Sequence, residues 1–282
     1  MLFEHEIPKG SKLYFGKSAK LKREIENHAS NILNKLGYEE IVTPFFSYHQ
    51  AQSIADSRSL VRVSDENNSQ ISLRADSTVD LVRIVTKRIG RVVNHKKWFY
   101  IQPVLNFPTK EQYQIGAEII DGSFEEIANT TIDMFKELNI SPILQIANIK
   151  IPEILYNEYN IDYDVIKFMN MEKILELKID WLLDLAKIHR VEDLKSIKGI
   201  PTNIKDELDK MFEVANKIDY DNIVISPLYY AKMRYYNSLT FRVFEGNELL
   251  ARGGAYNVDD IKAVGFTLYT DECITNIMNK GN

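Results

Sequence analysis

Residues 112–120 form a stretch whose alternate side chains could line a binding pocket. If the stretch is an extended strand, the residues sort onto two faces, with Tyr113, Ile115, Ala117 and Ile119 on one and Gln114, Gly116 and Glu118 on the other. On the second face a glycine separates an amide from a carboxylate, which leaves room for a ligand close to the backbone. The same pattern is typical of a solvated sheet face that tolerates a glycine, so both interpretations stay open.

A second stretch, residues 234–244, repeats this arrangement. Its alternation places Tyr235, Leu239, Phe241 and Val243 on one face and Tyr236, Ser238 and Thr240 on the other. The isolated pair Gly253-Gly254, followed by Tyr256, predicts a turn. Five residues separate Gly10 from Gly16, where a phosphate-binding loop requires four, so that interpretation is discarded.

The elements that would position these residues are mostly antiparallel strands with helices grouped between them. Helical spacing is found at 18–36, after a cap at Asp76 or Ser77, at 124–138 and throughout 161–218. Extended patterns are found at 60–63, 70–73, 98–105, 112–120, 142–149, 222–226, 234–245, 249–252 and 263–270. The first two, joined by turn-prone residues, predict an antiparallel hairpin, and 98–105 with 112–120 predicts a second strand pair. This order predicts an α+β fold rather than alternating βαβ units, with 161–218 as a helical insertion.

Composition restricts the class of protein. The 282 residues carry a net charge of -5, with 45% hydrophobic and 27% charged residues, which is typical of a folded globular chain. The single cysteine, Cys273, and the absence of an apolar leader or membrane-length apolar run predict a cytoplasmic protein. The scattered histidines show no metal-ligand spacing, so we expect neither a metal nor a cofactor.

Taken in order, several segments resemble the histidyl-tRNA synthetase family of class II synthetases, from Ile7 to about Leu268. They are residues 37–44, like the first class II motif; 73–78, like the amino-group loop; 98–121, like the second motif and its following strand; and Tyr235-Tyr236 with 253–256, like the histidine signatures. The resemblance implies an antiparallel sheet flanked by helices and dimerisation through the class II core. It also implies one catalytic-like domain over 1–282 without an anticodon-binding domain.

Two departures from the synthetase pattern decide the expected function. Asn106 stands at the arginine of motif two, and Glu272 stands at the arginine of motif three. A guanidinium grips phosphate oxygens and stabilises the charge that develops during adenylate formation, which neither an amide nor a carboxylate can do. We therefore predict that the chain is not an enzyme. tRNA and membranes are not expected as partners.

The amino-acid side of the pocket is retained. The resemblance implies that histidine is bound by Asp76, Thr78, Gln114, Glu118, Tyr236 and Tyr256. An ammonium beside a carboxylate, and an imidazole nitrogen bonded to another, are charge-assisted pairings. The pattern most resembles the regulatory-subunit family of ATP phosphoribosyltransferase. This implies an allosteric, histidine-binding regulator in a hetero-oligomer with the short catalytic subunit, which opens histidine biosynthesis.

Two alternatives stay open. A divergent amino-acid-activating ligase could hold ATP with Arg74, Lys110, Lys232 or Arg252. A synthetase-like scaffold that has lost ligand binding is favoured by Ala231 and Ala255, because a carboxylate clamp is then missing. ATP–pyrophosphate exchange identifies the ligase, and histidine binding separates sensor from scaffold.

Overall fold

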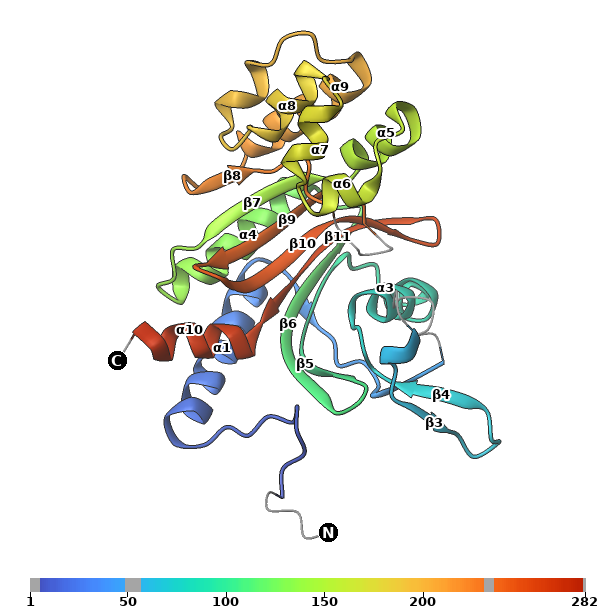
Figure 1. Ribbon diagram of the computed structural model, residues 1–282. Helices are drawn as coiled ribbons and strands as arrows, with labels where there is room; N and C mark the ends of the chain where they lie inside the picture. The colour runs from blue at the N-terminus through green and yellow to red at the C-terminus, as the bar shows by residue number, and fades with distance from the viewer. Residues whose placement is uncertain (1–5, 49–56, 231–235, 281–282) are drawn as a thin grey trace. The chain divides into compact units, whose positions relative to one another are not determined.

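A computed structural model describes residues 6–48, 57–230 and 236–280 (Figure 1). The chain divides into two compact units: Met1–Ile120 with Gly265–Asn282, and Asp121–Val264. Both combine helices with a mostly antiparallel sheet, so the predicted α+β class is confirmed. In the described part of the chain, no helix is long and apolar enough to cross a membrane.

The N-terminal unit is built on a long antiparallel strand pair. Its elements are α1 (Gly16–Lys35), β1 (Glu39–Glu40), β2 (Phe46–Ser47), β3 (Arg62–Ser64), β4 (Gln70–Leu73), α3 (Thr78–Lys87), β5 (Lys97–Asn106), β6 (Lys110–Ile120), the end of β11 (Ile261–Tyr269) and α10 (Thr270–Lys280). The strand order here is β1-β5-β6-β11, with β1 parallel to β5, while β2, β4 and β3 form a small separate sheet. Both predicted strand pairs, β3/β4 and β5/β6, are present and antiparallel.

The second unit continues from α4 (Phe124–Glu137) into its own strands. Those that follow are β7 (Ile143–Asn148), β8 (Ile223–Ile225), β9 (Tyr236–Glu245) and β10 (Glu248–Val258), in the order β10-β9-β7-β8. Between β7 and β8 lie α5 (Lys150–Tyr159), α6 (Tyr163–Lys167), α7 (Met171–Glu176), α8 (Asp180–Ala186) and α9 (Thr202–Ala215). Helices thus occupy the segment where helical spacing predicts them. Its assignment as an insertion within one domain stays a prediction.

The predicted turn at Gly253-Gly254 is wrong. β10 runs through both glycines, which pair with Phe241 and Thr240 of β9. Glycine is needed at position 254 because a Cβ there would lie 2.7 Å from the Leu239 carbonyl oxygen and 3.0 Å from the Tyr236 ring. The glycine pair therefore serves close strand packing rather than a change of direction.

The solvated-face interpretation of residues 112–120 is wrong at Gly116 and Glu118, which are buried, whereas Gln114 is half-buried. Glu118 is fully buried at 0% exposure, and the apolar face carries the buried side chains of Ile115 and Ala117. Nor does Gly116 leave space for a ligand. Tyr100 lies directly opposite it on β5, and a Cβ on Gly116 would lie 2.3 Å from the Tyr100 hydroxyl oxygen. The phenol ring fills the space that the missing side chain leaves.

Glu118, two residues after Gly116 on β6, likewise packs over a glycine, Gly265 of β11. A Cβ on Gly265 would lie 1.6 Å from a carboxylate oxygen of Glu118. The Tyr100 hydroxyl also reaches β11, 3.1 Å from the Thr267 hydroxyl. Tyr100 and Glu118 therefore each lie over a glycine of a neighbouring strand. A larger residue at either glycine must displace its partner.

We expect Gly116→Ala to lower the free energy of unfolding by about 1–3 kcal/mol, because the added methyl collides with the Tyr100 ring. The measurement is urea denaturation of the purified protein. In a Tyr100→Leu background, which removes the ring, the same substitution should cost markedly less. An equal cost in both backgrounds would show that the two residues are not in contact.

Candidate functional site

The loop that joins β4 to α3 is held by Arg74, which is 1% exposed. Its guanidinium donates to the backbone carbonyls of Pro103, at 2.8 and 3.0 Å, and of Thr43, at 2.6 Å, and lies 4.5 Å from the Phe45 ring. Burial lowers the pKa of Arg74 to about 10, so the side chain remains charged at neutral pH. Arg74 therefore fixes this loop against β5 and is committed to backbone oxygens. Arg74 is therefore unsuited to bind ATP, the role that the ligase alternative would give it.

The next residues place two of the predicted ligands at the start of α3. Ser77 is the N-cap residue of this helix, but its side chain makes no capping hydrogen bond. The carboxylate of Asp76, one residue earlier, accepts a hydrogen bond from the Val79 backbone nitrogen at 3.2 Å. The Ser77 hydroxyl accepts from the buried amide of Gln102 at 2.9 Å. Thr78, at 5% exposure, is the first residue of α3. The loop sequence thus fixes Asp76 and Thr78 beside each other at the helix N-terminus.

Tyr100 is the common neighbour of these residues and Glu118. Burial raises the pKa of its phenol well above the usual range, and the charges of Glu118 and Asp76 raise it further. Thr78 hydrogen-bonds the same hydroxyl. The phenol is therefore protonated at neutral pH, and negative charge near it favours a cationic ligand.

Gln114 lies two positions before Gly116 on the same strand and is half-buried. Its amide donates to the Gln112 side-chain oxygen at 3.0 Å, and its partner across the strand pair is Gln102. Gln102 is in turn fixed by Thr43, whose hydroxyl accepts at 2.8 Å and whose backbone nitrogen donates at 3.1 Å. The amides of Gln114 and Gln102 thus form a polar row that leads from β6 to Ser77 in the loop before α3.

In the second unit, Tyr236 and Tyr256 are direct partners in the β9/β10 pair. Tyr256 is 2% exposed. The Tyr236 ring lies close to Gly254, 3.0 Å from where a Cβ on that glycine would be. Thr240 lies on the same strand as Tyr236 and is 3% exposed; among the described residues its hydroxyl has no hydrogen-bond partner. Tyr236 and Tyr256, which are distant in sequence, therefore meet across one strand pair.

The predicted ligands form two groups, one in each unit. Asp76, Thr78 and Glu118 gather around Tyr100, with Gln114 farther along the row, and Tyr236 pairs with Tyr256. Sequence reasoning missed Tyr100 as the centre of the first group. The available signal was the pairing of a large aromatic residue with a glycine in two strands predicted to be neighbours. Ala231, Lys232 and Tyr235 lie outside the described residues.

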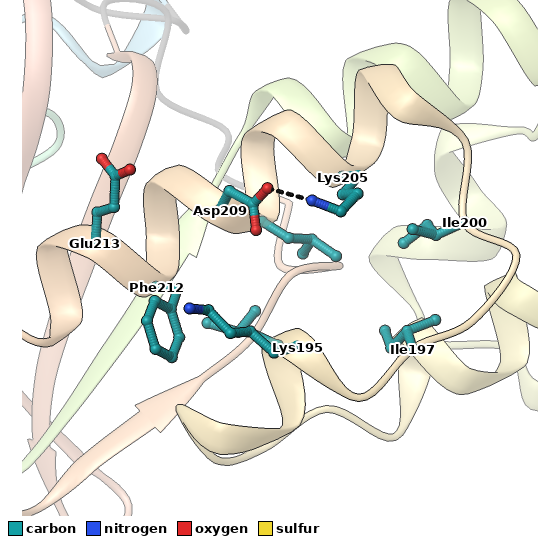
Figure 2. Close-up of a pocket in the computed structure, with 9 residues that line it drawn as sticks. Lys195, Ile197, Ile200, Lys205, Asp209, Phe212 and Glu213 are labelled. Carbon is teal, nitrogen blue, oxygen red and sulfur yellow. Dashed lines mark hydrogen bonds and ion pairs between the residues drawn. The ribbon is translucent and has the colours of Figure 1, made fainter.

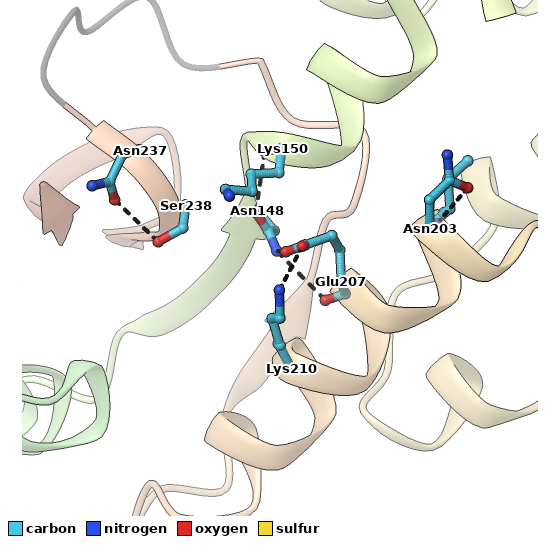
Figure 3. A network of polar contacts seen from close by, with 8 residues as sticks. Asn148, Lys150, Asn203, Glu207, Lys210, Asn237 and Ser238 are labelled. Atoms are coloured by element: carbon cyan, nitrogen blue, oxygen red, sulfur yellow. Dashed lines mark hydrogen bonds and ion pairs between the residues drawn. The ribbon is translucent and has the colours of Figure 1, made fainter. Parts of the chain in front are cut away.

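Polar contacts elsewhere in the second unit serve structural roles (Figure 3). The buried Asn148, at the end of β7, donates to the Glu207 carboxylate of α9 at 2.8 Å, and Lys210 donates to the same carboxylate at 2.6 Å. Asn148 also accepts from the Lys150 backbone nitrogen at 3.1 Å. This network joins α9 to the sheet and contains no predicted ligand.

A cavity of about 480 Å³ lies against α9, lined by Ile197, Ile200 and Phe212 among others (Figure 2). The Lys195 ammonium lies 3.7 Å from the centre of the Phe212 ring, and Lys205 pairs with Asp209 at 2.6 Å. Lys195, Lys205 and Asp209 are thus engaged with neighbouring side chains. Within the described ranges, no group of three or more His, Cys, Asp or Glu residues is arranged to hold a metal.

Comparison with known proteins gives the family. The histidyl-tRNA synthetase family model matches residues 15–178. Two curated relatives, each named "ATP phosphoribosyltransferase regulatory subunit", come from Wolinella succinogenes and Helicobacter hepaticus. The first is 45% identical over 99% of this chain and 98% of its own, and the second is 43% identical over 99% and 100%.

The fold agrees with these matches. A crystal structure titled as an ATP phosphoribosyltransferase regulatory subunit/histidyl-tRNA synthetase from Bacillus halodurans superposes with a TM-score of 0.85 at 18% identity, covering 98% of this chain and 84% of that one. The expected class II synthetase-like fold is therefore confirmed. The chain belongs to the histidyl-tRNA synthetase-like family, in its branch of ATP phosphoribosyltransferase regulatory subunits.

Proposed function

We propose that this chain is a non-catalytic regulatory subunit that binds histidine and activates the short catalytic subunit of ATP phosphoribosyltransferase, in the first step of histidine biosynthesis. The observation that carries the proposal is the fully buried carboxylate of Glu118, whose charge, together with that of Asp76, raises the pKa of the Tyr100 phenol. The names of the relatives support the regulatory role.

The charge of this cluster suits histidine. An α-ammonium would pair with Asp76 and Thr78, at the start of α3, and an imidazole N–H would donate to Glu118. Gln114 would contact the amino-acid backbone, and the assignment of Tyr236 and Tyr256 to the ring rests on the family resemblance alone. Hydrogen bonds to buried charged groups are stronger than neutral ones, so Glu118 and Asp76 should contribute most to affinity.

The proposal also holds that adenylation is lost. Asn106 ends β5 and pairs with Lys110, and Glu272 lies in the acidic first turn of α10. Next to it, the Asp271 carboxylate accepts from the Tyr14 hydroxyl and from the Tyr113 backbone nitrogen, the latter at 3.1 Å. An acidic helix start repels the phosphates that the synthetase arginine would grip.

We further propose that the chain forms a homodimer through its class II core and a hetero-oligomer with the catalytic subunit in the cytoplasm. The N-terminal unit supports this with large apolar side chains left in contact with solvent. They include Phe15 at 75%, Val42 at 77% and Phe46 at 58% exposure. In the proposed assembly a protein partner covers these side chains.

Histidine binding tests the sensor directly. We expect isothermal titration calorimetry to detect binding by the wild type and a loss of about 1.5–3 kcal/mol in Glu118→Gln, because one charge-assisted hydrogen bond is weakened. Glu125→Gln, a half-buried carboxylate of α4 paired with Lys217, is the matched control and should bind normally. Absence of wild-type binding would favour the scaffold interpretation instead.

ATP–pyrophosphate exchange tests the absence of catalysis. We expect no histidine-dependent exchange, because no arginine stands at positions 106 and 272 to stabilise adenylate formation. A histidine–tRNA ligase assayed in parallel serves as the positive control. Exchange clearly above background would establish the ligase alternative.

Mixing with the short catalytic subunit tests regulation. We expect this chain to raise the rate of phosphoribosyl transfer and histidine to lower the rate of the complex, with a coupling of about 1–3 kcal/mol and a reciprocal change in histidine affinity. Glu118→Gln should activate without the histidine response. An unchanged rate on addition of this chain would refute the regulatory role.

A further inference from the structure

A second cavity lies within the Asp121–Val264 unit, apart from every residue assigned to histidine. Its volume is about 340 Å³, and it is bounded by β9, the residues that follow β8, and the ends of α6 and α8. This volume is at the lower end of the range found for small-molecule sites. Its lining side chains include Met169, Leu185, Ile188 and Leu228 as an apolar wall.

The polar part of the lining is basic. Lys167, His189 and Arg242 face the cavity from three different segments, and none of its described lining residues is acidic. The Lys167 ammonium has a counter-ion outside the lining, Asp164, at 3.5 Å. Arg242 forms no ion pair with any described carboxylate. The cavity therefore carries an excess of positive charge.

The Arg242 guanidinium is fixed by neutral groups. Its Nε and Nη2 donate to the Gln145 side-chain oxygen, at 2.8 and 2.5 Å, and Cζ lies 4.1 Å from the Tyr229 ring centre and 5.9 Å from that of Phe244. Among the described residues, Nη1 has no hydrogen-bond partner. The Nη1/Nη2 edge thus keeps donors in the fork geometry that matches a carboxylate or phosphate.

We propose that this cavity is a binding site for a small organic oxyanion, a carboxylate or phosphate ester on a planar apolar group. The Nη1/Nη2 edge of Arg242 donates hydrogen bonds to the oxyanion, and Lys167 adds positive charge. The apolar wall and the Tyr229 ring contact the organic part. Because Arg242 is already oriented by Gln145 and Tyr229, binding requires little further ordering of its side chain.

The test uses the intact chain labelled with ¹³C at methionine methyl groups, because Met169 lines the cavity and Met211 lies in the core of α9 at 0% exposure. Phenyl phosphate and benzoate are titrated separately, with benzyl alcohol and inorganic phosphate as single-feature probes. We expect at least one aromatic oxyanion to shift the Met169 resonance and leave Met211 unchanged. The probe that binds identifies the oxyanion as phosphate or carboxylate.

Arg242→Gln should weaken that binding at least tenfold, and Arg190→Gln, at an exposed arginine outside the lining, should not. A shift of the Met211 resonance in Arg242→Gln would show that the core has changed, and Arg242→Lys is then used as the test variant. It should also weaken binding, because lysine lacks the planar pair of guanidinium donors. The site is refuted if neither aromatic oxyanion shifts Met169. It is also refuted if benzyl alcohol or inorganic phosphate binds the wild type as tightly as the aromatic oxyanions do. This comparison needs no variant.

Discussion

Close packing over two glycines is the constraint on which the N-terminal unit depends. Tyr100 occupies the space over Gly116, and the Glu118 carboxylate occupies the space over Gly265. Neither side chain could be buried there if the neighbouring strand carried a Cβ. Burial in turn raises the pKa of the phenol, and the charges of Glu118 and Asp76 raise it further. A steric requirement of the sheet thereby creates the electrostatic character of the proposed histidine site.

Local sequence patterns were sufficient to predict the helices and strands, but not the side-chain contacts between them. Sequence patterns identified the β5/β6 pair, and the loop sequence placed the start of α3 at Asp76 or Ser77. The role of Gly116 could not be found this way, because it depends on the residue opposite in the register rather than on its neighbours in sequence. Gly254 was misassigned for the same reason: the contacts that require a glycine come from Leu239 and Tyr236 across the strand pair.

The candidate site shows the same division between local and tertiary information. Family resemblance selected Asp76, Thr78 and Glu118, and the fold brings them to one phenol. Arg74, which the sequence offered as a cation for ATP, is instead enclosed by backbone carbonyls. The histidine-side residues are thus grouped within each unit, whereas this prominent arginine has a structural role. The proposed role, recognition of an amino acid without its activation, rests on that combination.

The most direct test of this central claim is ¹⁵N NMR spectroscopy of histidine labelled in its imidazole ring. When the protein binds it, we expect one ring nitrogen to shift toward the protonated, hydrogen-bonded position as it donates to Glu118. In Gly265→Ala, where the new methyl displaces that carboxylate, the shift should be lost. Ring nitrogens that resonate as in free histidine, or identically in both proteins, would contradict recognition through Glu118.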